Sequence, residues 1–158
     1  MAAFDCTLGR HLGDAFGVER CYLLDMSDSR NLRVLSAAED FAAAVLVAVR
    51  FVNAARAPGV RGQLVRSATA VPANIAEAAH LGTDPNFRRQ LRLALASASE
   101  STSHLRLLIR AGAIHPKRGT HCLGKAAVVC RMLTNLIRAI DEREAHTMER
   151  LRSPDAAP

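Results

Sequence analysis

Basic side chains recur at helical spacing between residues 85 and 118. Four arginines fall within about 40° of one another when each residue turns the helix by about 100°. These four, here called the arginine face, are Arg88, Arg92, Arg106 and Arg110. Arg89 lies beside them, and Lys117 and Arg118 extend the basic series past the end of the helix. Guanidinium groups suit phosphate oxygens, so the pattern predicts contacts with a nucleic-acid backbone.

The arginine face contains no aromatic residue. Stacking on bases is therefore not expected, and phosphate contacts alone do not read a sequence. The pattern favours non-specific binding to RNA or DNA. Two alternatives stay open, a solvated face or pairing with Glu77 or Glu100 between subunits. Lys117, Arg118 and Lys125 form the next candidate site if the arginine face does not bind.

Catalytic chemistry has one weak candidate. Arg110 and His115 have the Arg-x4-His spacing found in some helical ribonucleases, in which the histidine exchanges a proton and the arginine steadies a phosphate. Gly112 is expected to end the helix between them, which would separate the two side chains. The sequence therefore predicts no catalytic residue and no enzymatic activity, and a ribonuclease is the least favoured alternative.

The four cysteines do not form a metal-binding pattern. Cys6, Cys21, Cys122 and Cys130 include no pair at CxxC spacing, and no histidine cluster completes a zinc site. We expect free thiols in a reducing cytoplasm, with no metal and no cofactor. No segment offers the roughly 20 apolar residues needed to span a bilayer, and the N-terminus lacks a signal-peptide pattern. A soluble cytoplasmic protein without membrane partners is expected.

Charge is concentrated in the middle of the chain. The net charge is +6, and residues 56–140 hold thirteen Lys and Arg residues against three acidic residues. The ends are mildly acidic. Such an asymmetric distribution predicts a polyanionic partner, and a solvated basic surface is the alternative.

The hydrophobic pattern predicts an all-α protein, an antiparallel up-down-up-down four-helix bundle. Helices are expected at about 36–56, 60–80, 85–111 and 120–150. Ser36 and Glu39 resemble a capping box at the first helix, and Pro85 falls in the first turn of the third. Residues 1–35 are interpreted as an extension that is poorly ordered or partly helical, 36–152 as the bundle and 153–158 as a tail. Residues 1–25 are interpreted as a translated upstream stretch.

The second helix contains Pro72 within its apolar stripe. Proline removes one backbone hydrogen bond, so we expect a bent helix; two short helices are the alternative. Ala70 and Ala73 lie on the opposite face, where small side chains would let another helix approach. Together with Leu93 and Leu107, which lie off the core stripe of the third helix, they predict an oligomer interface.

The stretch QLVRSATAVPANIAE, residues 63–77, resembles the signature of the four-helix bundle proteins known as 23S ribosomal RNA intervening-sequence proteins. The positions that match are Gln63, Leu64, Arg66, Ala68, Val71, Pro72, Asn74, Ile75, Ala76 and Glu77. Phe87, Ser97 with Glu100, and Gly112 with Ile114 follow in the family's order. Val65, Ala70 and Ala78 depart from it, as does Thr102.

The resemblance implies a ring-like homopentamer. The family is also similar to the accessory proteins of diversity-generating retroelements, basic pentameric bundles that bind nucleic acid and a reverse transcriptase. Pro72, Asn74, Ile75 and Glu77 would then be structural signature residues. The function expected is non-specific nucleic-acid binding by a non-enzymatic oligomer. The resemblance implies that it acts as an accessory factor to a reverse transcriptase or in a ribosomal RNA context. The alternative is a protein-interaction scaffold with an acidic partner.

Overall fold

The computed structural model describes residues 33–80 and 85–152. Its elements are α2 (Arg33–Ala48), η3 (Val49–Phe51), η4 (Ala54–Arg56), α3 (Val60–His80), α4 (Pro85–Arg110) and α5 (Pro116–Arg152). The described part of the chain contains no strand. The expected all-α fold with four long helices is therefore confirmed.

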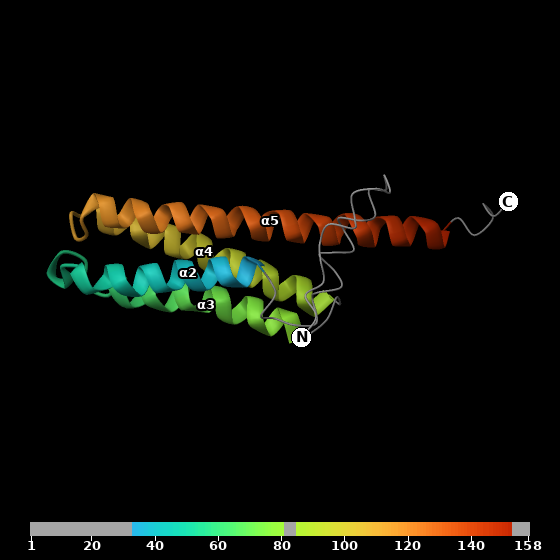
Figure 1. The fold of residues 1–158 in the computed structure, drawn as a ribbon, viewed down its shortest axis with the longest axis horizontal. Helices are drawn as coiled ribbons and strands as arrows, with labels where there is room; N and C mark the ends of the chain where they lie inside the picture. Colours follow the sequence, from blue (N-terminus) through green and yellow to red (C-terminus); the bar gives the residue numbers. More distant parts are fainter. Residues whose placement is uncertain (1–32, 81–84, 153–158) are drawn as a thin grey trace, which may run out of the picture.

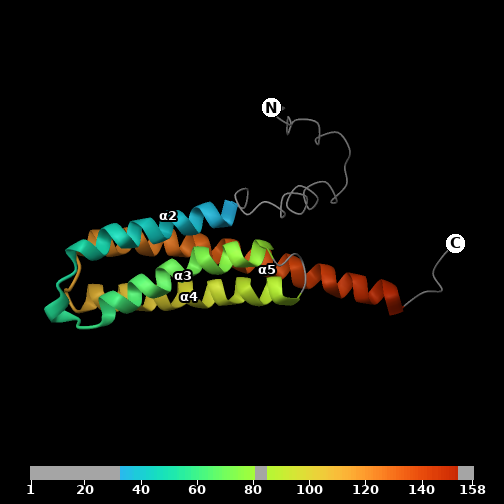
Figure 2. The same cartoon turned by 90° about the horizontal axis from the view of Figure 1, so that it is seen from below.

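Each long helix packs against its neighbours in the chain, and α2 closes the bundle against α5 (Figures 1 and 2). The connection after α2 meets the turn after α4, because the Asn53 amide donates to the Ala113 carbonyl at 2.8 Å. The Arg56 side chain also donates to the Gly112 carbonyl at 3.2 Å. The C-terminal ends of α2 and α4 therefore lie at the end of the bundle where α3 and α5 begin, which is consistent with the up-down-up-down order.

The core consists of apolar stripes from all four helices. In α3 the apolar spacing predicts an inner stripe of five residues, and all five are buried. They are Leu64, Ala68, Val71, Ile75 and Ala78. Phe41 of α2, Phe87 of α4 and Leu133 of α5 add large side chains that are fully buried. At about 25 cal/mol per Å² of apolar surface, such burial is the main stabilising term.

The first helix begins earlier and ends earlier than the sequence suggested. It starts at Arg33 and ends as an α-helix at Ala48, followed by two short 3-10 turns. Val34 and Leu35 are buried, so their packing draws this first turn into the helix. The expected cap at Ser36 is therefore wrong. Residues 1–32, including the interpreted upstream stretch, and 153–158 lie outside the described residues. The same is true of Thr83 and Asp84, which the sequence pattern predicts as the N-terminal cap of the third helix.

Helix α3 runs without interruption from Val60 to His80, with Pro72 inside it. The alternative of two short helices is therefore wrong. Val71 and Ile75 are both fully buried, so the apolar contacts on either side of Pro72 hold the helix together despite the missing hydrogen bond. The bend itself stays a prediction.

Apolar spacing in the sequence predicts Thr102 and Ile109 in the buried stripe of α4, and Met132 and Leu136 in that of α5, and the structure differs at these positions. In α4, Ser101 and Leu108 are fully buried, whereas Thr102 and Ile109 are half-buried. In α5, Leu133 and Ile137 are buried, whereas Met132 and Leu136 are half-buried; Val129 and Ile140 are buried as expected. In α4 the buried positions keep alternating steps of four and three residues up to Leu108, which is the spacing of a heptad repeat.

Helix α5 begins at Pro116, four residues before the expected start. Proline suits a first helical position because its missing N–H needs no partner there. The Lys117 amide donates to Nδ1 of His115, which therefore caps the helix. Gly112 has a φ of +59°, so the expected glycine after the end of α4 is confirmed.

Candidate nucleic-acid interface

The structure divides the arginine face into two halves. Near the start of α4, Arg88 donates to Asp141 at 3.0 Å and also to Glu144, both on α5. Arg92 reaches Asp141 at 3.3 Å. The Asp141 and Glu144 side chains pair with these arginines while each stays 41% exposed. The carboxylates of α5 therefore occupy this half of the arginine face.

The pKa of Arg88 lies above its ordinary value, chiefly because of its hydrogen bond with Asp141 and further because of Glu144. Desolvation acts in the opposite direction and is outweighed. Arg88 therefore stays charged and joins α4 to α5. It is a structural cation, which makes it a poor candidate for phosphate binding.

The other half of the arginine face is open. Arg106 and Arg110 are exposed, and neither forms an ion pair with another residue that the structure describes. The same holds for Arg89 near the start of α4. These guanidinium groups keep their donors available for a ligand.

Arg110 belongs to a larger group of cations, here called the basic end. It consists of exposed side chains on the two connections that meet at one end of the bundle. The members are Arg50, Arg56, Arg61, Arg110, Lys117 and Arg118. The sequence contains no Asp or Glu in residues 41–76 or 101–140, the segments that build this end. Like charges gathered without carboxylates create a positive potential that attracts a polyanion.

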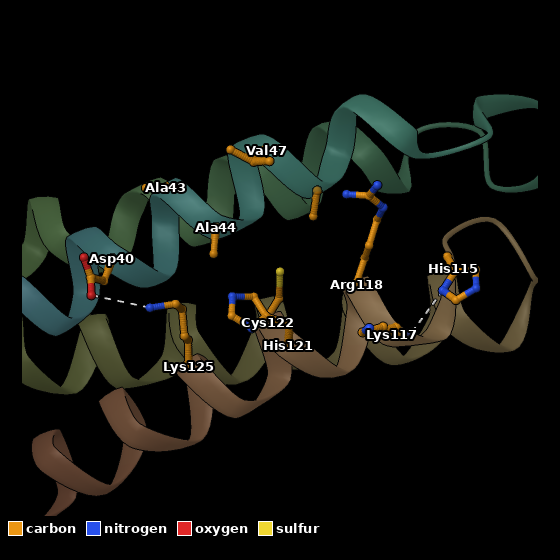
Figure 3. Close-up of a pocket in the computed structure, with 11 residues that line it drawn as sticks. Asp40, Ala43, Ala44, Val47, His115, Lys117, Arg118, His121, Cys122 and Lys125 are labelled. Carbon is orange, nitrogen blue, oxygen red and sulfur yellow. Dashed lines mark hydrogen bonds and ion pairs between the residues drawn. The ribbon is translucent and has the colours of Figure 1, made fainter.

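A groove of about 910 Å³ runs from the basic end between α2 and α5 (Figure 3). The wall from α2 is apolar, with Ala43, Ala44, Val47 and Ala48. The wall from α5 carries His115, Lys117, Arg118, His121 and Lys125, with Cys122 at its base. Arg118 and Lys125 extend from α5 toward α2 in Figure 3, and Lys125 pairs with Asp40 at 3.4 Å. Lys117 and Arg118, which follow the arginine face in the chain, therefore line the same groove as Lys125.

An aromatic side chain lies against this basic wall. The guanidinium carbon of Arg118 is 3.8 Å from the centroid of the Phe51 ring, a cation–π contact. Phe51 is 55% exposed. The arginine face contains no aromatic residue, and stacking on bases was therefore not expected. The fold brings an aromatic ring to the basic residues, because Phe51 and Arg118, 67 positions apart in the chain, meet at the end of the bundle.

The remaining predicted positions are not members of the basic end. Leu93 and Leu107 are 40% and 52% exposed on α4, and Ala73 is exposed on α3 while Ala70 is half-buried. These positions are accessible, as an interface requires. Of the signature residues, Ile75 is a core residue and Glu77 is exposed. Pro72 and Asn74 are half-buried.

The Arg110 and His115 pair does not form a catalytic arrangement. Gly112 ends α4 between the two residues, and Nδ1 of His115 accepts the capping hydrogen bond from Lys117. One ring nitrogen is therefore engaged in a structural role. No contact between the two side chains supports a shared phosphate site.

Nothing in the described residues groups three or more His, Cys, Asp or Glu side chains around a possible metal position. Burial raises the pKa of the Cys122 thiol, and it does the same for Cys130. Both thiols therefore favour the protonated, less reactive form. Over the described ranges, no helix is both long and apolar enough to cross a membrane.

The fold and its cationic groove define a small helical-bundle protein with a polarised surface. Its family follows from the sequence: the 23S rRNA-intervening sequence protein family model matches residues 30–135, so the chain belongs to this family. A similar solved structure is a protein of unknown function from the S23 ribosomal protein family of Bacteroides thetaiotaomicron. It is 27% identical, with a TM-score of 0.60 over 66% of this chain and 97% of that one. No curated protein matches the chain.

Proposed function

We propose that this chain forms a non-enzymatic, oligomeric up-down-up-down bundle that binds nucleic acid through phosphate contacts at the basic end. The observation that supports this function is the gathering of six exposed cations with no acidic residue in the segments that carry them. A ribosomal RNA context is suggested by the family's name. We further propose that the protein acts in the cytoplasm as an accessory factor to a reverse transcriptase. This part rests on the family's similarity to the accessory proteins of diversity-generating retroelements.

Compared with the arginine face predicted from the sequence, the proposed site is centred nearer the C-terminal end of α4. Arg106, Arg110, Lys117 and Arg118 stay as candidate phosphate ligands, and Arg89 is an outlying one. Arg88 and Arg92 are assigned to the contact with α5, because their donors are directed at Asp141 and Glu144. Lys125 borders the site while paired with Asp40.

Salt dependence tests the proposal directly. Each phosphate neutralised contributes a slope of about −0.7 to −0.9 to log affinity against log salt concentration, because bound counterions are released. We expect the combined substitution of Arg110, Lys117 and Arg118 by Gln to weaken binding to mixed-sequence RNA and DNA alike. The slope should flatten by about 2 to 3 if all three groups contact phosphates. Fluorescence anisotropy over a salt series measures both quantities.

A matched control removes the same charge elsewhere on the molecule. Arg131, Arg138 and Arg143 are exposed on α5 away from the basic end, and their replacement by Gln should leave most of the slope. Equal losses in both triple variants would show a response to net charge alone. Wild-type protein with no salt-sensitive binding at low ionic strength would contradict the proposed function.

A further inference from the structure

We propose that the groove between α2 and α5 is a binding site for single-stranded nucleic acid, with bases toward α2 and phosphates toward α5. This inference rests on the proposed function and narrows it to one class of nucleic acid. The groove opens at the basic end, so a strand attracted there would enter it directly.

The two walls of the groove match the two sides of a single strand. Lys117, Arg118 and Lys125 supply cationic donors on the α5 wall. The α2 wall offers small apolar side chains and Val47, which is 55% exposed. Residues 41–48 of α2 contain no polar side chain, and a helix that is apolar on all faces is normally covered. An unstacked base covers such a surface with its apolar face, while its phosphate stays with the cations.

A duplex uses only half of this site. Its bases are paired inside the helix, so its outer surface offers phosphates to the α5 wall and nothing to cover Val47 or the alanines. Proteins that bind single strands combine a cationic groove with aromatic side chains on which bases stack. The arrangement of charge and apolar surface therefore favours a single strand.

The Phe51 and Arg118 contact supplies a stacking platform at the mouth of the groove. The ring holds the guanidinium group at 3.8 Å from its centroid, which fixes a flat cation in place before any ligand arrives. Bases stack both on aromatic rings and on guanidinium planes. Phe51 is exposed, so a base can reach this pair from solvent. An acidic protein helix could pair with the cations of the α5 wall, but it has no flat bases to stack on the Phe51 and Arg118 platform.

The experiment compares a fluorescein-labelled oligouridylate of about 15 nucleotides with a hairpin duplex carrying the same number of phosphates. We expect the single strand to bind at least about tenfold more tightly at low salt, since stacking adds to phosphate contacts. A second probe, an oligonucleotide with 2-aminopurine, should lose fluorescence on binding as the base stacks.

Two substitutions separate stacking from charge. Phe51→Leu keeps an apolar side chain, and Arg118→Lys keeps the positive charge, but each removes one plane of the platform. Both should reduce single-strand affinity by about five- to twentyfold, within the range of one stacked base. Neither should change duplex affinity by more than about twofold, because duplex binding uses charge. Met148→Leu and Arg131→Lys, which alter exposed positions of α5 outside the groove, serve as matched controls.

The outcomes are distinguishable. If the two nucleic acids bind equally and both variants behave like wild type, the groove proposal is wrong while nucleic-acid binding stands. If wild type binds neither probe, both proposals fail, and binding of an acidic amphipathic peptide in that case would assign the groove to a protein partner. Circular dichroism checks that each variant is folded, and Arg118→Lys leaves the apolar contacts of Phe51 in place if Phe51→Leu is unstable.

Discussion

Ser101 and Ser67 form a hydrogen-bonded pair inside the bundle. Ser101 is fully buried, and its hydroxyl oxygen lies 2.8 Å from that of Ser67, joining α4 to α3. The Ser101 hydroxyl also lies 2.9 Å from the Ser97 carbonyl, and Ser67 lies 3.3 Å from the Leu64 carbonyl. Each hydroxyl has one proton, so Ser101 donates to Ser67 while Ser67 donates to the Leu64 carbonyl, and the Ser97 carbonyl competes for the Ser101 proton.

Replacing either serine by Ala should lower the free energy of unfolding by about 1 kcal/mol, the usual net value of one hydrogen bond. The double variant should lose less than the sum of the single losses, because both partners disappear together. Urea denaturation of all four proteins measures this coupling. Losses that add to within about 0.3 kcal/mol would show that the hydroxyl pair contributes nothing of its own.

Some single-residue features can be predicted from the local sequence pattern, and others cannot. The signature from Gln63 to Glu77 and the glycine after α4 are visible in the sequence, because backbone conformation and family pattern are local properties. The pairing of Arg88 with Asp141 and Glu144 spans more than 50 positions. Helical periodicity places Arg88 on a face but says nothing of which acids lie opposite. The same limit hid the meeting of Phe51 and Arg118.

At the scale of the elements, Gly119 is a point of close approach between α5 and α4. A Cβ atom added at Gly119 would lie about 2.5 Å from Cγ1 of Ile109, a distance that requires a shift of the side chain or of the helix. Gly124, one turn further along α5, has open space at the corresponding position. Because Gly119 has no side chain, the first turn of α5, which carries Lys117 and Arg118, packs directly against α4.

The two glycines give a matched pair of variants. Gly119→Ala should lower the free energy of unfolding by about 1 to 3 kcal/mol through overpacking. Gly124→Ala should raise it by about 0.5 to 1 kcal/mol, because alanine is the better helix former. Thermal denaturation followed by circular dichroism compares them. Stabilisation by both substitutions would show that Ile109 moves aside without penalty.

The helices themselves were predicted with unequal success. The bounds of the second helix agree with α3, because Gly59 and the apolar stripe define a single uninterrupted period. The first helix was placed too far along the chain, since burial of Val34 and Leu35 outweighs the cap pattern at Ser36. The last helix was started too late because Pro116 was interpreted as part of a loop, whereas it is the first helical residue.

The whole molecule exposes apolar side chains on more than one face. Leu93 and Leu107 lie on the same helix as the open half of the arginine face, and Ala73 lies on α3. Light scattering at micromolar concentration should show an oligomer, with five subunits the number that the family resemblance implies. Leu107→Asp should shift the mass toward the 17.0 kDa monomer, because a carboxylate is costly to bury. Met148→Asp, at an exposed position near the end of α5, is the control.

A monomeric mass for the wild-type protein would contradict the predicted oligomer. Equal effects of Leu107→Asp and Met148→Asp would show that Leu107 is not specifically part of the interface. The nucleic-acid proposals stand independently of this result, since the basic end and the groove are complete within one chain.

The closure of α2 against α5 has a consequence for how the bundle assembles. Asp40 and Lys125, which meet across the groove, are 85 residues apart, whereas α3 and α4 are consecutive in the chain. Bringing distant segments together restricts the chain more than closing a short connection does. The groove therefore exists only in the fully closed molecule, after the two ends of the bundle sequence have met. A ligand that touches both walls would bind the closed chain alone, and so would hold the first and last helices together against local opening.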